Sequence, residues 1–94
     1  SGGDADGLVV LDGTRFNLEI KSVQSVARVS KAHAHQAGKA GQQLRSIPVI
    51  WLPDAAATSG RFWFLGRSTQ VEGVEVVCGD ASTLLKRLHR IKPN

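Results

Sequence analysis

The stretch DADGLVVLDGTRFNLEIKS, residues 4–22, decides the fold that we expect. Residues 8–11 are a short apolar run suited to a buried strand, and Asp12-Gly13 is a strong signal for a two-residue hairpin turn. Residues 15–21 then alternate between polar and apolar side chains, which is typical of a strand with one buried face. We therefore predict two antiparallel strands joined at Asp12-Gly13.

The sequence after this hairpin changes to a helical period. Apolar or small side chains recur at steps of three and four residues from about residue 26 to residue 44, at Val26, Val29, His33, Ala37, Ala40 and Leu44. This spacing predicts a helix over residues 26–44. Glycine weakens a helix by about 1 kcal/mol relative to alanine. We expect Gly38 and Gly41 to let the helix lie close to a sheet.

The second half of the chain alternates between strand and turn signals. Residues 48–52, 61–65 and 74–77 read as short strands, and Gly79-Asp80 offers a cap for a closing helix. The apolar face of that helix consists of Leu84, Leu85, Leu88 and Ile91. The order strand, strand, helix, strand, strand, strand, helix predicts an α/β domain with a mixed sheet over residues 4–94. Residues 1–3 read as a linker or a cloning remnant.

Composition limits the classes of protein that this chain can represent. Its 94 residues suffice for one domain, and 41% hydrophobic with 21% charged residues is an ordinary globular mixture. One cysteine excludes an internal disulfide framework, and we find neither a signal-peptide pattern nor an apolar run near the ~20 residues of a membrane span. We therefore expect a cytoplasmic protein without a membrane partner.

The charge balance is basic. Twelve Lys and Arg against eight Asp and Glu give a net charge of +4. Such a balance favours an anionic partner such as nucleic acid, although many small basic domains have none. Cations on the predicted first helix (Arg28, Lys31 and Lys39) are the expected phosphate contacts. A second group on the closing helix, Lys86, Arg87, Arg90 and Lys92, is explained by the helix dipole alone.

The hairpin register brings two acids together. If Asp12 and Gly13 are the two loop residues, Leu11 pairs with Thr14, and positions that sum to 25 face each other. Asp6 then lies opposite Glu19, at about 5 Å between Cβ atoms. Lys21 shares the face of Glu19, because the two are separated by one residue on a strand.

Two carboxylates placed opposite each other repel unless a cation lies between them. A divalent ion such as Mg²⁺ or Mn²⁺ takes carboxylate oxygens, and a nearby lysine can orient a water or stabilise charge on a phosphate. Asp6, Glu19 and Lys21 therefore form a candidate site for metal-assisted phosphodiester hydrolysis. The alternative is a solvated sheet face with ordinary charges.

These residues also resemble a known family. Asp6, twelve intervening residues and then Glu19-Ile20-Lys21 resemble the D…(D/E)xK signature of the PD-(D/E)XK nuclease superfamily. The hairpin DADGLVVLDGTRFNLEIKS is similar to that of nuclease-related (NERD) domains, as are HQAGKAGQQL, IPVIWL and VEGVEVVCGDASTLLKRL. The resemblance covers roughly residues 4–88.

The resemblance implies a restriction-endonuclease-like fold and a magnesium-dependent nuclease, with DNA as the expected substrate and RNA as the open alternative. Asp6 and Glu19 would hold the metal together with the carbonyl of Ile20. Lys21 would be the catalytic lysine, and Gln36 matches a glutamine often found on the following helix.

The sequence departs from that family at its start, because these nucleases usually carry a helix before the hairpin. Either the chain is a minimal or excised version of the domain, or a second copy of the chain or a partner domain supplies this element. Two alternatives remain open: a catalytically incomplete module that binds nucleic acid or a protein partner, and the nuclease tip of a larger toxin.

Overall fold

The predicted hairpin is present with the predicted register. The computed structural model describes residues 5–66 and 69–93. Strand β1 (Gly7–Leu11) pairs antiparallel with β2 (Thr14–Ile20), with Leu11 opposite Thr14 and Gly7 opposite Leu18. Asp12 and Gly13 both have positive φ, at 49° and 81°, as a type I′ turn requires.

Three further strands complete a mixed sheet. They are β3 (Ile47–Leu52), β4 (Gly60–Leu65) and β5 (Val71–Cys78), and the spatial order is β1-β2-β3-β5-β4. The central strands β2, β3 and β5 run parallel, whereas β1 and β4 pair antiparallel at the two edges. This arrangement confirms the predicted mixed sheet.

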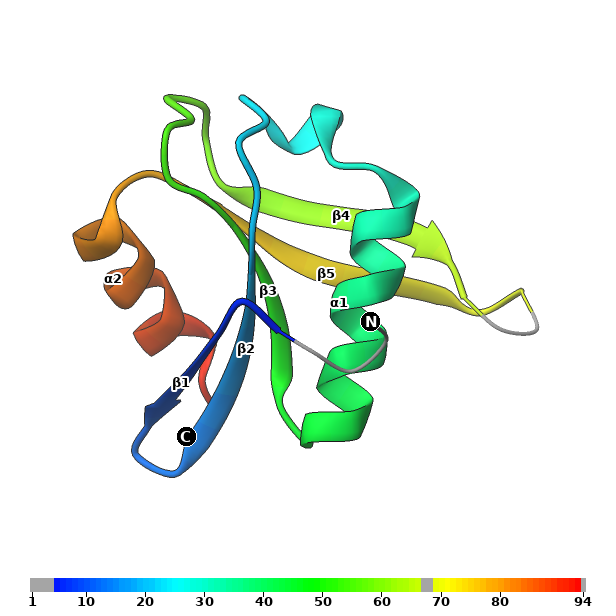
Figure 1. Cartoon of the computed structure of the whole chain (residues 1–94), viewed down its shortest axis with the longest axis horizontal. Helices are drawn as coiled ribbons and strands as arrows, with labels where there is room; N and C mark the ends of the chain where they lie inside the picture. The colour runs from blue at the N-terminus through cyan, green and yellow to red at the C-terminus, as the bar shows by residue number, and fades with distance from the viewer. Residues whose placement is uncertain (1–4, 67–68, 94) are drawn as a thin grey trace.

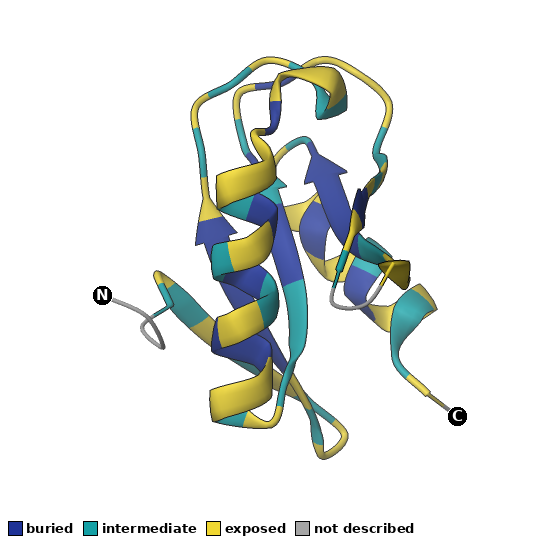
Figure 2. Ribbon diagram, turned by 90° about the vertical axis from the view of Figure 1, so that its right-hand side faces the viewer, coloured by how far each residue is buried: buried dark blue, intermediate teal, exposed yellow. Residues whose placement is uncertain are grey.

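Helices α1 (Lys31–Leu44) and α2 (Ala81–Ile91) cover opposite faces of the sheet (Figure 1). The core is accordingly divided into two apolar clusters. One cluster includes Ala34 and Ala37 of α1, and the other includes Leu84 and Leu88 of α2. Figure 2 shows the buried side of α1 turned toward the sheet and its exposed side turned to solvent. The expected α/β class is therefore confirmed.

The first helix begins later than predicted. Residues 26–28 form a short 3₁₀ turn, Val29 is extended, and the side chain of Ser30 caps α1 by accepting from the backbone N–H of His33 at 3.1 Å. A serine cap satisfies a helix-terminal donor, which fixes the start of the helix at Lys31. The prediction of a helix from residue 26 was therefore wrong, and Arg28 lies outside α1.

Close packing of α1 on the sheet is built around Gly41. A Cβ at this position would lie 2.8 Å from the carbonyl oxygen of Ser46. Nearby, Asn17 of β2 donates from Nδ2 to the carbonyl of Ala37 at 3.1 Å and accepts from the hydroxyl of Ser46 at 2.8 Å. The predicted close approach is confirmed at Gly41, whereas a Cβ at Gly38 would meet nothing within 4 Å.

Neither α1 nor α2, the α-helices of the described ranges, is long and apolar enough to cross a membrane.

Candidate active site

Asp6 lies directly before β1, one residue beyond the last pair of the ladder, Gly7 opposite Leu18. Its backbone N–H donates to the carbonyl of Leu18 at 2.9 Å. Its carboxylate Oδ2 accepts from the backbone N–H of Ile20 at 2.8 Å. The two-residue turn thus holds the Asp6 carboxylate against the strand that carries Glu19.

Glu19 is a buried acid without full hydrogen bonding. Only 1% of the residue is exposed, and its Oε1 has no partner. Burial raises the pKa of Glu19 above its ordinary value, and the negative charge of Asp6 raises it further. The charge of Lys21 acts in the opposite direction and lowers that pKa. Both neighbours therefore act on the Glu19 carboxylate.

Lys21 and Ile20 follow directly in the chain. The backbone N–H of Lys21 donates to the carbonyl of Trp51 on β3 at 3.0 Å, and the residue is half-buried. Because residues two apart on a strand share a face, Lys21 lies on the face of Glu19. The N–H and C=O of one strand residue point to the same neighbouring strand, so the Ile20 carbonyl lies on the edge toward Asp6.

The donor set fits a hard divalent cation. It consists of the Asp6 and Glu19 carboxylates and the Ile20 carbonyl, which are all oxygen ligands. Within residues 5–66 and 69–93, no cluster of three or more His, Cys, Asp or Glu could hold a metal. Mg²⁺ is commonly bound by one or two carboxylates and keeps several waters, so a two-carboxylate site suits it. The unpartnered oxygen of Glu19 is the observation that favours a cation here.

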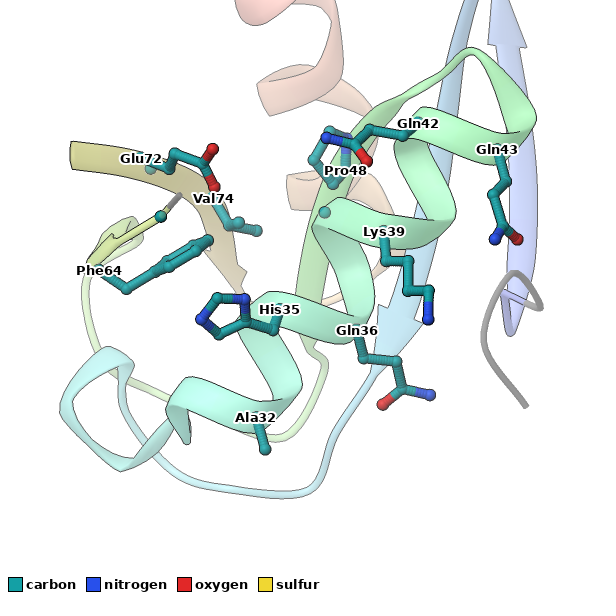
Figure 3. Close-up of a pocket in the computed structure, with 13 residues that line it drawn as sticks. Ala32, His35, Gln36, Lys39, Gln42, Gln43, Pro48, Phe64, Glu72 and Val74 are labelled. Carbon is teal, nitrogen blue, oxygen red and sulfur yellow. The ribbon is translucent and has the colours of Figure 1, made fainter. Parts of the chain in front are cut away.

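Gln36 and Lys39 lie beside one another on α1. Figure 3 shows their side chains on one side of the helix, with His35 on the other side toward Phe64. The ring centroids of His35 and Phe64 are 4.4 Å apart. Gln36, Lys39 and His35 line an open groove of about 1120 Å³ that extends over α1 toward β4 and β5. In the described part of the chain, no hydrogen bond joins Gln36 to Asp6, Glu19 or Lys21.

The three cations expected to contact phosphate are not gathered on one surface. Arg28, Lys31 and Lys39 are all exposed, but only Lys39 lines the groove. Arg28 lies in the 3₁₀ turn. Asp4, which would become the acid of the site if the hairpin register shifted by two residues, lies outside the described residues.

Asn17 of β2 and His33 of α1 are two polar residues whose surroundings the sequence did not reveal. Asn17 is fully buried and holds α1 over β2 through its hydrogen bonds. It lies two residues before Glu19, on the same face of β2. In the sequence, Asn17 alternates with Glu19 and Lys21 on one face of the strand. The alternation predicted that this face is exposed to solvent. His33, expected to be a hydrogen-bonded core histidine, has a buried Nδ1 without a partner in the described chain.

Comparisons of the chain with known protein families, with curated proteins and with solved structures gave no match. The chemistry of the site is therefore inferred from its own residues: a buried, incompletely bonded carboxylate, a second carboxylate opposite it, and a lysine on the same face.

Proposed function

We propose that this domain is a metal-dependent nuclease of the PD-(D/E)XK type that hydrolyses phosphodiester bonds, in DNA in preference to RNA. The observation that carries the proposal is the Glu19 carboxylate, buried with an unpartnered Oε1 opposite Asp6. A buried acid of this kind is costly, and such costs persist mainly where function needs them.

Each residue has a definite part in this proposal. Asp6, Glu19 and the Ile20 carbonyl would hold Mg²⁺ or Mn²⁺. When bound, the ion would polarise the phosphate and lower the pKa of a water. The Lys21 ammonium would orient the attacking water and stabilise negative charge that develops on the phosphate. Gln36, on the side of α1 that also bears Lys39, would contact the substrate rather than the carboxylates.

The groove over α1 is the proposed path for the nucleic acid. It combines Lys39 and His35 with the side-chain amides of Gln36, Gln42 and Gln43, which can donate to phosphate and sugar oxygens. Arg28, in the 3₁₀ turn, and Lys31, at the start of α1, are exposed cations that do not line this groove. The net charge of +4 supports attraction of a polyanion to this surface.

A second candidate is a catalytically incomplete module of the same fold that binds nucleic acid. It is favoured by the two-carboxylate donor set, because no third acid or imidazole joins Asp6 and Glu19 in the described residues.

Cleavage assays separate the two candidates. Supercoiled plasmid and tRNA would be incubated with the protein in Mg²⁺, in Mn²⁺ and in chelator. We expect cleavage only with a divalent ion, loss of cleavage in Asp6→Asn and Glu19→Gln, and retention in Asp54→Asn, which removes an exposed acid elsewhere. Cleavage in chelator, or by Glu19→Gln at the wild-type rate, would overturn the nuclease proposal. Binding without cleavage would favour the second candidate.

A further inference from the structure

A hollow on the opposite side of the sheet gathers cations that the nuclease site does not use. It measures about 290 Å³ and lies between α2 and the loop before β4. Helix α2 contributes positions at helical spacing, and the loop contributes two hydroxyl residues. The lining residues are Thr58, Ser59, Thr83, Lys86, Arg87 and Arg90.

The lining is entirely cationic or hydroxyl-bearing. Two carboxylates contact residues of this lining, Asp80 through Thr83 and Glu75 through Arg87. Asp80 accepts from the backbone N–H and from the hydroxyl of Thr83, both at 2.9 Å. Glu75 forms ion pairs with Arg61 and Arg87. Lys86 and Arg90 form no ion pair with any residue that the structure describes, so their charge is open to an external anion.

Part of this hollow is held in place by the fold. Ser59 is fixed by β5, because the backbone N–H of Cys78 donates to its Oγ at 2.9 Å. Arg87 is oriented by Glu75, whose Oε2 lies 3.4 Å from its Nη2. Walls that are positioned before binding lower the cost of ordering side chains around a ligand.

We propose that this hollow binds a phosphate group. Arg and Lys side chains bind phosphate oxygens in proteins, and Lys86 and Arg90 supply such cations here. The hydroxyls of Ser59 and Thr83 donate to the Cys78 carbonyl and to Asp80, so the cations carry the proposal. One water occupies about 30 Å³ of liquid, so the volume admits a phosphate together with some of its hydration. The hollow lies on the α2 face and Glu19 on the α1 face, so this site is separate from the metal site and does not depend on the nuclease proposal.

The first test uses inorganic phosphate and no metal. Amide signals of ¹⁵N-labelled protein would be followed by NMR during phosphate titration, with chloride holding the ionic strength constant. We expect saturable shifts at Thr58, Ser59 and Thr83, and binding about tenfold weaker in Lys86→Ala and in Arg90→Ala, since each removes one charged donor. The control Arg15→Ala removes an exposed cation on β2 and should bind phosphate like wild type.

A second arm identifies the source of the phosphate. A short single-stranded oligonucleotide would be titrated in chelator, which prevents metal-dependent cleavage. If Lys86→Ala weakens its binding and reduces the salt slope by about 0.7, the site takes a backbone phosphate of nucleic acid. If oligonucleotide binding is unchanged while phosphate binding is lost, the site takes free phosphate or a phosphomonoester.

Shifts that never saturate, or equal behaviour of Lys86→Ala and Arg15→Ala toward inorganic phosphate, would overturn the proposal. Loss of nuclease activity in the cleavage assay would leave this result untouched, because the titration requires no metal and no reaction.

Discussion

Two glutamates are buried in the same sheet, and their surroundings differ sharply. Glu75 on β5 is 7% exposed and forms ion pairs with Arg61 and Arg87. Glu19 on β2 is 1% exposed, forms no ion pair among the described residues, and faces a second carboxylate at Asp6. One acid is neutralised by the chain itself and the other is not.

The comparison separates a buried charge that the protein compensates from one that it does not compensate. A buried charge is tolerated when a partner compensates for its lost hydration, as the two guanidinium groups do for Glu75. Glu19 lacks such a partner, and Lys21 offsets only part of the effect of burial and of Asp6 on its pKa. A divalent cation between the two carboxylates would supply the missing compensation.

The largest expected effect is on the rate of cleavage by Lys21→Ala. A positioned group that assists proton transfer contributes about 10²–10⁴-fold to a rate, so we expect a loss in that range. Lys21 is half-buried and forms no ion pair with described residues, so the melting temperature should move by only a few degrees. Cleavage rate and thermal melting would be measured together. Lys39→Ala is the matched control. If both variants lost the same modest part of the cleavage rate, Lys21 would contribute only general positive charge and would have no catalytic role.

The next effect is on stability, with opposite signs for the two glutamates. In metal-free buffer at pH 7.5, Glu75→Gln should lower the free energy of unfolding by about 1–3 kcal/mol, because it leaves two guanidinium groups without their carboxylate. Glu19→Gln should raise it by about 1 kcal/mol, because it removes a buried negative charge and, with it, the repulsion from Asp6. Urea unfolding followed by circular dichroism measures both. The same sign for both substitutions would contradict the distinction between them.

The pH dependence sharpens the same distinction. The pKa of Glu19 is raised above its ordinary value of 4.5, so its folded form holds the proton more tightly than its unfolded form. The contribution of Glu19 to the free energy of unfolding is therefore fully present below pH 4.5. It is lost as the pH rises from there through the raised pKa of the folded state. The difference in unfolding free energy between wild type and Glu19→Gln should grow over this range. The lowered pKa values of Asp12 and Asp80 change stability with pH in the opposite direction. Their contributions are the same in both proteins and therefore cancel in the difference. A difference independent of pH would contradict a raised pKa at Glu19.

The smallest expected effect is on nucleic-acid affinity. Lys39→Ala should weaken duplex binding modestly and reduce the slope of log K against log salt by about 0.9, the value for one phosphate contact. Fluorescence anisotropy in chelator at several salt concentrations measures the slope. Arg15→Ala is again the control, and an unchanged slope for Lys39→Ala would remove the groove over α1 from the binding path.

The hairpin and the pairing of its acids were predictable because both depend on local chemistry. Asp12-Gly13 adopts positive φ at both positions, and this two-residue turn fixes every pair in the ladder. The contact of the Asp6 carboxylate with the backbone of Ile20, next to Glu19, lies one residue beyond that ladder. The exposure of Trp63, which is 60% exposed, likewise follows from alternation along a short strand.

Other features depend on tertiary contacts that no spacing reveals. The cap at Ser30 sets the start of α1, although the apolar period in the sequence begins four residues earlier, at Val26. The depth of Glu19 depends on α1 lying close over β2, which Gly41 and Asn17 permit. The hollow beside α2 joins Ser59 to a helix far along the chain, and this contact cannot be read from the spacing of the cations on that helix.

The central claim is that Glu19 and Asp6 share a divalent cation, and thermal melting with and without Mn²⁺ tests it most directly. A ligand at a hundredfold excess over its Kd stabilises the folded state by about 2.7 kcal/mol, or roughly 10 °C or more for a domain of this size. We predict that Mn²⁺ raises the melting temperature of wild type, that chelator reverses the rise, and that Glu19→Gln melts higher than metal-free wild type but does not respond to Mn²⁺. An equal response in both proteins, or none in either, would contradict the account.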